Sequence, residues 1–316
     1  MGEAAIGVDV GGTKTALGLI DAASRTLLAT RVIPTARERG GAAVLSDIEE
    51  HATALAGQGA GLGYRTVGIG VVVPENVNLA GQITSSAVIP QWNELPVASV
   101  LGAIAPAVIE ADVRAAAFAE ASLGAGREYG YHVFLTVGTG ISYCAVSGGR
   151  PFAGAHGGAL HLGTSVLAIL PDGEEIVLER LASGGALVRR YVARGGSAVR
   201  AEEVLAAARA GSATAQEVLA QGAQALGAGI ALLINMLDPE AVVIGGGLGS
   251  ADTEYGAAAQ RWASHYVLAH AASTPLVRGQ LGADAGVIGA GLIGLLVPLI
   301  NSNSHSDQEE VTRSGS

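Results

Sequence analysis

Three glycine-rich turns carry the residues of this sequence that are best suited to chemistry, and each follows a strand-like run. In the first turn, Asp9 ends a strand and Gly11 and Gly12 follow it. Glycines let backbone N–H groups come close to a ligand, and N–H groups gathered in a turn form a concave site that suits phosphate. The alternative for this segment, taken alone, is a plain β-hairpin turn.

The side chains of the same turn also suit a phosphate ligand. Thr13 adds a hydroxyl donor and Lys14 adds a positive charge. Asp9 is suited to hold a water bound to Mg²⁺, because this ion keeps several waters and uses few carboxylates. The spacing is neither that of a Walker loop nor that of a dinucleotide-binding fingerprint.

Two further glycine turns lie later in the chain, again after strand-like runs. They are, in order, Gly138-Thr139-Gly140 and Gly245-Gly246-Gly247. Each turn alone is a weak signal, since glycine turns between strands are common. Together and in this order the three turns are more specific, and their repetition hints at two related halves.

A carboxylate stands at the start of a helical segment. Asp112 opens an alanine-rich run that ends near Gly124. A carboxylate placed there can accept the proton of an alcohol that attacks phosphorus. The alternative is structural, because Asp is a favoured residue at the N-cap of a helix.

The sequence resembles the ROK family of sugar kinases, within the hexokinase/actin/Hsp70 superfamily, from about residue 6 to residue 298. The family's opening Asp-x-Gly-Gly-Thr-Lys is intact at Asp9–Lys14, and its second phosphate loop is matched at residues 138–142. Its adenosine-side glycines are matched at residues 245–247, and its closing helix at residues 282–290. The resemblance implies a glucokinase-like enzyme that binds ATP and Mg²⁺ in a cleft between two actin-like, ribonuclease H-like domains.

The resemblance also gives Asp112 the role of catalytic general base. The family's catalytic aspartate lies in the pattern Asn-Asp-x-x-x-x-Ala-x-x-Glu. That pattern falls on residues 111–120, where Asp112, Ala117 and Glu120 match it. Phosphoryl transfer needs mainly positioning and charge neutralisation, which the glycine turns and Mg²⁺ would supply.

The sugar side of the family pattern is altered in this sequence. The asparagine before the catalytic aspartate is Ala111, and the sugar-binding glutamate is Ala159. The zinc-ligand histidine and the three zinc cysteines are replaced by Leu162, Leu170, Asp172 and Val177. A tetrahedral zinc site needs histidine and cysteine ligands, so we expect a variant without zinc.

Four residues are candidates for binding the acceptor. The resemblance gives Glu179 a sugar contact, and a shift of one residue would place His161 in the sugar pocket; otherwise His161 is an ordinary partly buried histidine. Glu75 and Asn78 lie in a long loop, where they face the acceptor or are simply solvated. A site that has lost polar contacts discriminates differently among acceptors, so an aminosugar, a modified hexose or a carbocyclic analogue fits as well as glucose.

Composition excludes several classes of protein. With 316 residues, 49% hydrophobic and 15% charged, the chain is neither an extended charged coiled coil nor wholly disordered. The 18 Lys and Arg against 28 Asp and Glu give a net charge of −10, which argues against a nucleic-acid partner. The single Cys144 forms no intramolecular disulfide, and the apolar segment 285–300 is shorter than the roughly 20 residues of a membrane span. We therefore expect a cytoplasmic protein with no membrane partner.

The elements that must position these residues alternate between strands and helices, which predicts an α/β fold. We expect a small domain of residues 1–112 with a C-terminal helix at about 285–300, and a large domain of residues 113–284. Residues 301–316 are polar and are predicted to be disordered. The apolar helix at 224–237 belongs to the core or to an oligomer interface, and we expect a homodimer.

The leading interpretation is an ATP-dependent kinase that transfers the γ-phosphate to a primary hydroxyl of a hexose or hexose-like acceptor. One alternative is a catalytically silent homologue that binds sugar and nucleotide. Another is a sugar-sensing regulator. Regulators of the family carry a DNA-binding helix-turn-helix ahead of the first motif, and because that motif begins at Asp9 we expect none here.

Overall fold

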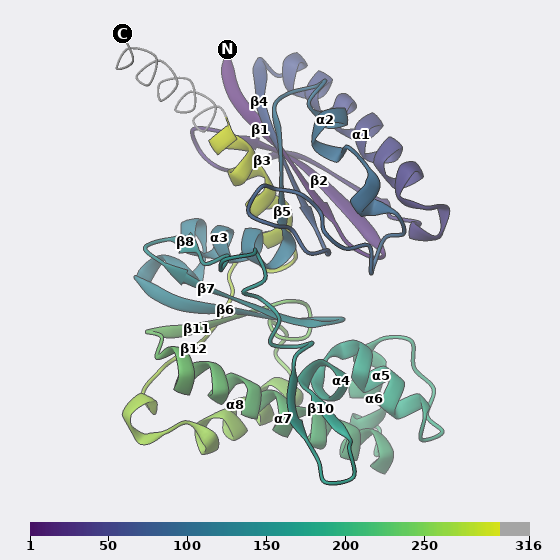
Figure 1. Ribbon diagram of the computed structural model, residues 1–316, viewed down its shortest axis with the longest axis vertical. Coiled ribbons are helices and arrows are strands. Elements are labelled where there is room, and N and C mark those ends of the chain that lie inside the picture. The colour runs from purple at the N-terminus through teal and green to yellow at the C-terminus, as the bar shows by residue number, and fades with distance from the viewer. Residues whose placement is uncertain (298–316) are drawn as a thin grey trace. The chain divides into compact units, whose positions relative to one another are not determined.

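The computed structural model describes residues 1–297, which form two compact units (Figure 1). Unit 1 comprises Met1–Ala119, Ala153–Gly158 and the described residues from 284 onward, and unit 2 comprises Glu120–Phe152 and Ala159–Ala283. Each unit contains one five-stranded sheet with helices, so the predicted mixed α/β character is confirmed. The predicted domain bounds, 1–112 with 285–300 and 113–284, stay a prediction, and the tail at 301–316 lies outside the described residues.

The sheet of unit 1 has the strand order β3-β2-β1-β4-β5. Its strands are β1 (Gly2–Val10), β2 (Lys14–Asp21), β3 (Leu27–Pro34), β4 (Tyr64–Val73) and β5 (Ala107–Ala111). The first three strands form an antiparallel meander, and β4 and β5 run parallel to β1. The first predicted glycine turn is thus the β1–β2 hairpin connection, and β5 leads directly into the helix that begins at Asp112.

Helices cover both faces of this sheet (Figure 1). They are α1 (Gly41–Gly61), α2 (Val97–Leu101), α3 (Asp112–Leu123) and the C-terminal helix Gly282–Val297, with the short 3-10 turns η1 (Arg37–Arg39), η2 (Trp92–Glu94) and η5 (Gly282–Asp284). Gly59 of α1 lies against Leu19 of β2. The preceding residue of that strand, Gly18, faces Val287 of the C-terminal helix. Because neighbouring residues of a strand point to opposite faces, the two helices lie on opposite sides of the sheet.

Glycines let the C-terminal helix lie directly on the sheet. A Cβ on Gly70 of β4 would collide with the carbonyl oxygen of Ala290, and one on Gly68 would collide with that of Gly294. The two backbones are therefore closer than any larger residue would permit. This confirms the prediction of a buried helix for the described part of 285–300, and it gives part of the chain's high glycine content a packing role.

The sheet of unit 2 has the order β12-β11-β6-β7-β8. Its strands are β6 (Tyr131–Val137), β7 (Ile141–Ser147), β8 (Arg150–Pro151), β11 (Ala241–Gly245) and β12 (Leu276–Arg278). The pairs β6–β7 and β7–β8 are antiparallel, whereas β11 is parallel to both β6 and β12. This order repeats that of unit 1, with a three-strand meander followed by two parallel strands beside its first member. The hint of two related halves is confirmed.

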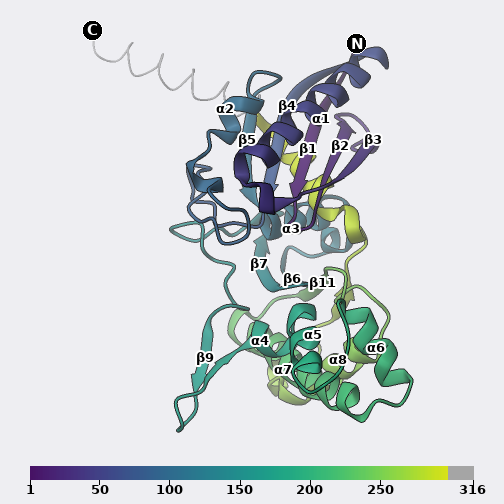
Figure 2. The same cartoon turned by 90° about the vertical axis from the view of Figure 1, so that its right-hand side faces the viewer.

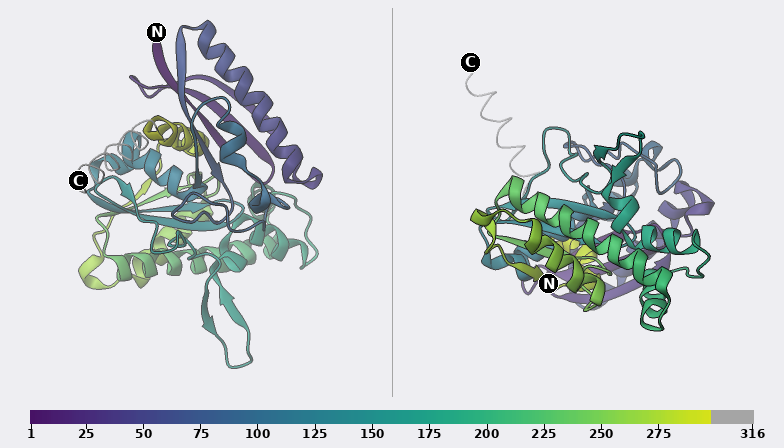
Figure 3. Two further views of the ribbon diagram at one scale, coloured as in Figure 1. Left: turned by 45° about the horizontal axis from the view of Figure 1, so that its top comes forward. Right: turned by 90° about the horizontal axis from the view of Figure 1, so that it is seen from below.

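Helices of unit 2 pack against the sheet around one apolar core. They are α4 (Leu178–Ala182), α5 (Gly184–Val192), α6 (Ala201–Arg209), α7 (Ala213–Leu237) and α8 (Glu254–Tyr266), with the 3-10 turns η3 (Ala125–Glu128) and η4 (Ala269–Ala271). The long helices α7 and α8 run side by side (Figure 3). Leu226, Ile230 and Leu233 of α7 are buried in this core, so one face of the helix at 224–237 is a core face.

The segment where the family pattern places zinc ligands forms a β-hairpin. Strands β9 (Val166–Ile169) and β10 (Glu175–Val177) pair only with each other and project from unit 2 (Figure 2). The turn is closed by hydrogen bonds between Leu170 and Glu174 and between Gly173 and Leu170. Ile169 at its tip is 68% exposed. The short, exposed strands of this hairpin carry no alternating apolar pattern in the sequence.

One helix in the part of the chain that the structure describes is long and apolar enough to cross a membrane. This helix is α7, and 56% of its most apolar window is buried inside the structure. A buried core helix passes the same test of length and composition, so the match is weak evidence for a membrane span.

Candidate active site

Asp9 lies near the end of β1 and is half-buried. Its carboxylate lies against Gly286, in the first turn of the C-terminal helix, where a Cβ would overlap it. The pKa of Asp9 is raised to about 7, first by burial and then by the negative charge of Asp112, while Lys14 acts in the opposite direction. Asp9 and Asp112 therefore lie close enough to repel each other, as two groups that serve one site would.

The turn after Asp9 is held by a residue that sequence analysis missed. The backbone N–H of Gly11 donates to the Lys14 carbonyl over 3.0 Å, which closes the turn. The buried Thr35, just after β3, donates its hydroxyl to the Gly11 carbonyl over 2.6 Å, and its N–H donates to the Thr13 carbonyl over 2.9 Å. The only sequence signal for this role is that a threonine directly follows the third strand.

The side chains of the turn remain available to a ligand. Thr13 and Lys14 are both exposed, and Gly11 and Gly12 are partly exposed. Next to Gly12 stand the side chains of Val88 and Arg37. The exposed guanidinium of Arg37, another residue that sequence analysis missed, adds a second positive charge beside this turn.

Asp112 is the first residue of α3 and is open to solvent. One carboxylate oxygen accepts a hydrogen bond from the N–H of Val113 over 2.6 Å. Desolvation by the surrounding protein raises the pKa of Asp112 to about 6, against the lowering effects of the Val113 N–H and the charge of Arg114. Asp112 thus combines an accessible carboxylate with a pKa near neutrality, which suits a proton acceptor.

Glu75 shapes its own loop through four hydrogen bonds. One oxygen accepts hydrogen bonds from the N–H groups of Val88 and Ile89, over 2.7 and 2.9 Å. The other accepts from Ser85 over 2.6 Å and Ala87 over 2.9 Å. A carboxylate offers about four lone-pair positions, and all four are used. Glu75 is therefore a buried loop-forming residue and not a solvated one, and its predicted contact with the acceptor stays a prediction.

Asn78 is also engaged within its loop. Its side-chain oxygen accepts hydrogen bonds from the N–H groups of Ala80 and Gln82, and its amide nitrogen donates to the Gln82 side chain. This is the arrangement of an Asx turn. Both lone pairs of the Asn78 oxygen are used locally, and the predicted contact of Asn78 with the acceptor stays a prediction.

The two later glycine turns lie side by side in unit 2. The N–H groups of Leu248 and Gly249, just after the third turn, both donate to the carbonyl of Val137, just before the second. Gly246 has φ +80°, and a Cβ there would lie 2.5 Å from the same carbonyl oxygen. Positive φ is rarely adopted by residues other than glycine. Only a glycine at position 246 permits this close approach.

Glu179 supports the second glycine turn. It lies in α4, and its carboxylate accepts a hydrogen bond from the N–H of Ile141 over 2.8 Å. A Cβ on Gly140 would lie 2.6 Å from the same carboxylate oxygen. At the other end of the turn, the N–H of Gly184 donates to the Gly138 carbonyl over 2.8 Å. The turn Gly138-Thr139-Gly140 is thus held from both sides by α4 and α5.

His161 lies on a segment that packs near Glu179. The N–H of Glu179 donates to the carbonyl of Gly163, two residues after His161. The ring of His161 is half-buried, and its Nδ1 is 3.4 Å from the hydroxyl of Thr164. This places His161 in the same unit as Glu179, and its predicted contact with a sugar stays a prediction.

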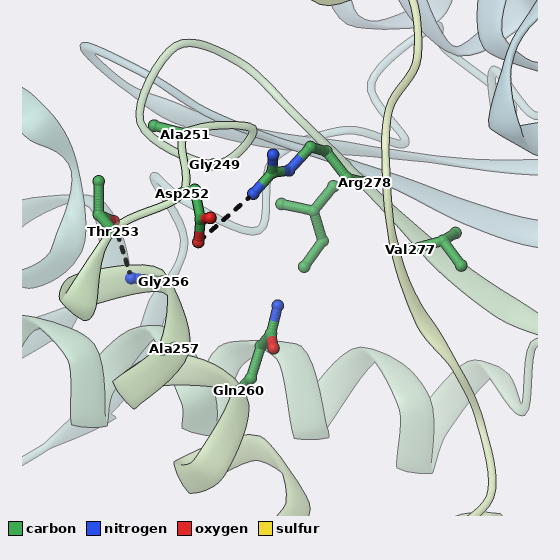
Figure 4. A pocket seen from close by; sticks show the side chains of 10 residues that line it. Gly249, Ala251, Asp252, Thr253, Gly256, Ala257, Gln260, Val277 and Arg278 are labelled. Carbon is green, nitrogen blue, oxygen red and sulfur yellow. Dashed lines mark hydrogen bonds and ion pairs between the residues drawn. The ribbon is translucent and has the colours of Figure 1, made fainter.

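Two pockets lie in unit 2. A small one of about 80 Å³ follows β11 and β12 and is lined by Ile244 and Gly249, which flank the third glycine turn. Arg278 pairs there with Asp252 over 3.8 Å, and Gln260 points inward from α8 (Figure 4). A larger groove of about 460 Å³ lies between α6, α7 and α8. None of the predicted site residues lines either pocket.

Within residues 1–297, no group of three or more His, Cys, Asp or Glu side chains is arranged to hold a metal ion. A site of the Mg²⁺ type does not require such a group, because this ion keeps several waters and is bound through one or two carboxylates plus substrate phosphates. The neighbouring carboxylates Asp9 and Asp112 fit that requirement, since a divalent cation would relieve their mutual repulsion.

A model of the ROK family matches residues 5–295 of the chain. Among characterised relatives, the bifunctional enzyme NanE/NanK of Brucella melitensis is 35% identical over 289 residues, covering 89% of this chain and 52% of that protein. The chain therefore spans about half the length of this relative. A glucokinase of Streptomyces coelicolor is 30% identical, covering 77% of this chain and 81% of that protein. A kanosamine kinase of Amycolatopsis mediterranei is 27% identical, with coverages of 92% and 96%.

Solved structures of the same family share the fold. A ROK hexokinase from Thermus thermophilus matches with a TM-score of 0.78 and 33% identity, covering 93% of this chain and 98% of that one. A ROK glucokinase from Streptomyces griseus, in complex with glucose and AMPPNP, matches with a TM-score of 0.75 and 26% identity, with coverages of 92% and 99%. The predicted fold class of two actin-like α/β domains is confirmed. From the family match over nearly the whole described chain, and from relatives at 30% identity or more, we conclude that this protein belongs to the ROK family.

Proposed function

We propose that this chain is an ATP-dependent sugar kinase that transfers the γ-phosphoryl group to a primary hydroxyl of a hexose or hexose-like acceptor. The observation that carries the proposal is the pair of neighbouring carboxylates in unit 1, Asp9 at the end of β1 and Asp112 at the start of α3. Relatives named for glucose and kanosamine phosphorylation support the same activity.

Asp112 is proposed as the general base. An alcohol is a weak nucleophile, and a positioned carboxylate accepts its proton as the oxygen attacks phosphorus. With its pKa raised to about 6, Asp112 is mostly ionised at neutral pH and is still a stronger base than an ordinary aspartate. Its accessible carboxylate leaves room for the hydroxyl of an acceptor.

The glycine turns are proposed to hold the nucleotide. A Cβ on Gly138 or on Gly247 would have no protein atom within 4 Å, so the space beside these two backbones is open to a ligand. Backbone N–H groups in such turns bind phosphate without needing a positive side chain. In unit 1, Gly11, Gly12 and Thr13 are proposed to act in the same way, with the charge of Lys14 beside them.

Mg²⁺ is proposed to be held by Asp9 through a water. When bound, this ion neutralises the charge that builds up on the transferring phosphoryl group. The chain's own contribution is to present Asp9 beside Asp112 and to hold it against Gly286. The first-turn glycine of that helix is what lets the carboxylate occupy this position.

Glu179 and His161 remain the proposed acceptor contacts, and Glu75 and Asn78 remain candidates whose side-chain oxygens are engaged within their own loop. Ala111 and Ala159 stand where the family pattern has polar contacts to the sugar. An acceptor that lacks the matching groups, such as an aminosugar, a modified hexose or a carbocyclic analogue, is therefore proposed beside glucose.

A cytoplasmic homodimer stays part of the proposal, and light scattering on the purified full chain tests the oligomeric state.

The test is an ATP-consumption assay on the purified full chain with Mg²⁺ and four acceptors: glucose, kanosamine, N-acetylmannosamine and myo-inositol. Mass spectrometry identifies any phosphorylated product. We expect turnover of at least one acceptor, and a loss of roughly 10²–10⁴-fold in kcat for Asp112→Asn, the usual contribution of a general base.

Asp21→Asn is the matched control, because Asp21 lies in the same unit, is partly exposed and hydrogen-bonds only within its own turn. It should keep wild-type turnover. AMPPNP binding by calorimetry should be retained in Asp112→Asn. If the wild-type chain binds AMPPNP and phosphorylates none of the four acceptors, the catalytically silent homologue replaces the kinase as the better account.

A further inference from the structure

We infer that Arg114 is a positioning residue of the acceptor site, which holds the loop after β4 and the segment 153–158 in fixed places beside Asp112. The inference rests on the proposed function, in which Asp112 receives the acceptor hydroxyl. The family pattern matched above assigns no role to position 114.

The guanidinium of Arg114 contacts three separate segments of unit 1. It is only 2% exposed. Its Nε donates to the Glu110 carboxylate over 2.7 Å, and its Nη2 reaches the same oxygen over 2.5 Å. Nη2 also donates to the Val77 carbonyl over 2.9 Å, and Nη1 donates to the Gly157 carbonyl. Only the planar, forked arginine side chain supplies donors in these three directions at once.

The contact with Val77 fixes one end of a long loop. Glu75 anchors the other end, because its four hydrogen bonds draw residues 85–89 together. Val77 itself pairs with Ile83 across the loop. Two buried charged groups, Arg114 and Glu75, thus preorganise this loop. Such preorganisation lowers the entropy cost of binding an acceptor.

The contact with Gly157 fixes a second segment. Gly157 has φ +79°, and a Cβ there would collide with the same Val77 carbonyl that Arg114 binds. The loop and the segment 153–158 are therefore packed against each other directly, with the guanidinium joining their carbonyls. Gly157 stands two residues before Ala159, the position that the family pattern gives to a sugar-binding glutamate. Arg114 thereby holds the start of a stretch that the family uses for its sugar.

The experiment compares Arg114→Lys and Arg114→Met with the wild-type chain in the kinase assay on glucose and kanosamine. Arg65→Met is the matched control, because Arg65 is exposed and forms only a surface ion pair with Glu3. We expect Arg114→Met to raise the acceptor KM at least roughly tenfold and to leave the ATP KM within about twofold. Arg114→Lys should also raise the acceptor KM, since it loses the fork that joins the three segments.

Hydrogen exchange on the unliganded proteins provides a readout that does not depend on activity. Exchange in residues 75–89 and 153–158 should be faster in both Arg114 variants and unchanged in the β1–β2 hairpin.

If Arg114→Met unfolds, Arg114→Lys and Glu110→Gln provide the same comparison. Wild-type exchange in both segments, or equal increases in the KM of acceptor and ATP, would overturn the inference. If the wild-type chain phosphorylates no acceptor, the kinase proposal fails separately, and the exchange result alone then decides whether Arg114 holds the loops.

Discussion

The ionisation of two aspartates in unit 1 is set by their surroundings and not by their chemical type. Asp9 and Asp112 have pKa values of about 7 and about 6, compared with 3.8 for an unperturbed aspartate. Desolvation by the surrounding protein is the larger cause in both, and the charge of Asp112 adds to it for Asp9. Two carboxyl groups that interact in this way release their protons in coupled steps. These raised pKa values support the proposed roles of Asp9 at the cation and of Asp112 as the proton acceptor.

The first prediction concerns the pH dependence of turnover. If Asp112 must be ionised to accept the acceptor proton, kcat/KM should fall as the pH drops through about 6 to 7, because both carboxyls take up protons there. An ordinary aspartate would place this limb near pH 4. The measurement is kcat/KM for the preferred acceptor between pH 4.5 and 8.5. A flat profile down to pH 5 would remove Asp112 from the role of base.

The second prediction concerns stability. The folded pKa of Asp9 lies above its unfolded value of 3.8, so the native state binds this proton more tightly, and the group's contribution to stability falls as the pH rises from about 4 to 7. Asp9→Asn should therefore raise the free energy of unfolding at pH 8 by roughly 1–3 kcal/mol and change it little at pH 4. Urea unfolding at both pH values measures the difference.

Asp21→Asn is the control for this stability measurement. The pKa of Asp21 is lowered, first by its hydrogen bond with the Ser24 hydroxyl, so its contribution to stability is present at pH 8 and is lost in acid. The variant should therefore lose a little stability at pH 8, opposite in sign to Asp9→Asn. A loss of stability for both variants would show that Asp9 is a structural carboxylate.

At the scale of elements, each glycine turn is held by a partner from elsewhere in its own unit. Thr35 after β3 holds the first turn, α4 and α5 hold the second, and the Val137 carbonyl joins the second to the third. These partners are the positioning residues of the turns. The turn glycines themselves divide into those that touch the protein and those that face open space.

The third prediction separates these two kinds of glycine. Gly246→Ala should lower the free energy of unfolding by roughly 2 kcal/mol or more, because it places a side chain at φ +80° and against the Val137 carbonyl. Gly247→Ala meets no protein atom within 4 Å, so it should change stability by less than about 0.5 kcal/mol. It should nevertheless raise the ATP KM, since the methyl group would occupy the proposed ligand space. Thermal unfolding and nucleotide titration measure the two effects, and unchanged ATP binding in Gly247→Ala would argue against a nucleotide at this turn.

At the scale of the whole molecule, the two units share one topology and differ in their buried ionisable groups. Unit 2 contains His132 in β6, which is fully buried, and neither ring nitrogen has a hydrogen-bond partner in the described chain. Desolvation lowers the pKa of His132, whereas the neighbouring backbone of Tyr129 and the carboxylates of Glu120 and Glu240 act in the opposite direction. A neutral histidine in this environment resists protonation.

The fourth prediction follows from this difference between the units. The folded pKa of His132 lies below its unfolded value of 6.5. Below pH 6.5 the unfolded state therefore binds a proton at His132 that the native state does not bind. Unit 2 should lose stability as the pH falls through this range. Asp9 and Asp112 act oppositely and make unit 1 relatively more stable in acid. Hydrogen exchange at pH 5 and pH 8 should show faster opening in β6 and β11 at pH 5 and no such change in β1 and β4. His132→Leu should abolish the acid effect, and equal acid sensitivity in that variant would contradict the assignment.

The sequence alone predicted the elements that carry strong local signals. The β1–β2 hairpin, the helix beginning at Asp112 and the strand before Gly245 were predicted, because apolar runs bounded by glycine or by a helix-capping residue act through neighbours in the chain. The same reasoning predicted neither the β9–β10 hairpin nor the break at Ser183 between α4 and α5. The hairpin strands are short and exposed, so they lack the buried, alternating pattern on which strand prediction depends.

The residue types and the order of the three turns were thus sufficient to indicate the family, the fold class and the pair of aspartates, because these depend on local backbone chemistry that the chain encodes directly. Only the tertiary structure showed that the side-chain oxygens of Glu75 and Asn78 accept hydrogen bonds within their own loop. It also showed that Thr35 and Arg114 bind backbone carbonyls 24 and 43 residues away in the sequence. Whether a polar side chain faces a ligand or a backbone group depends on which donors the fold brings within about 3 Å of it. That distance is set by the packing of segments remote in sequence, and no local pattern records it.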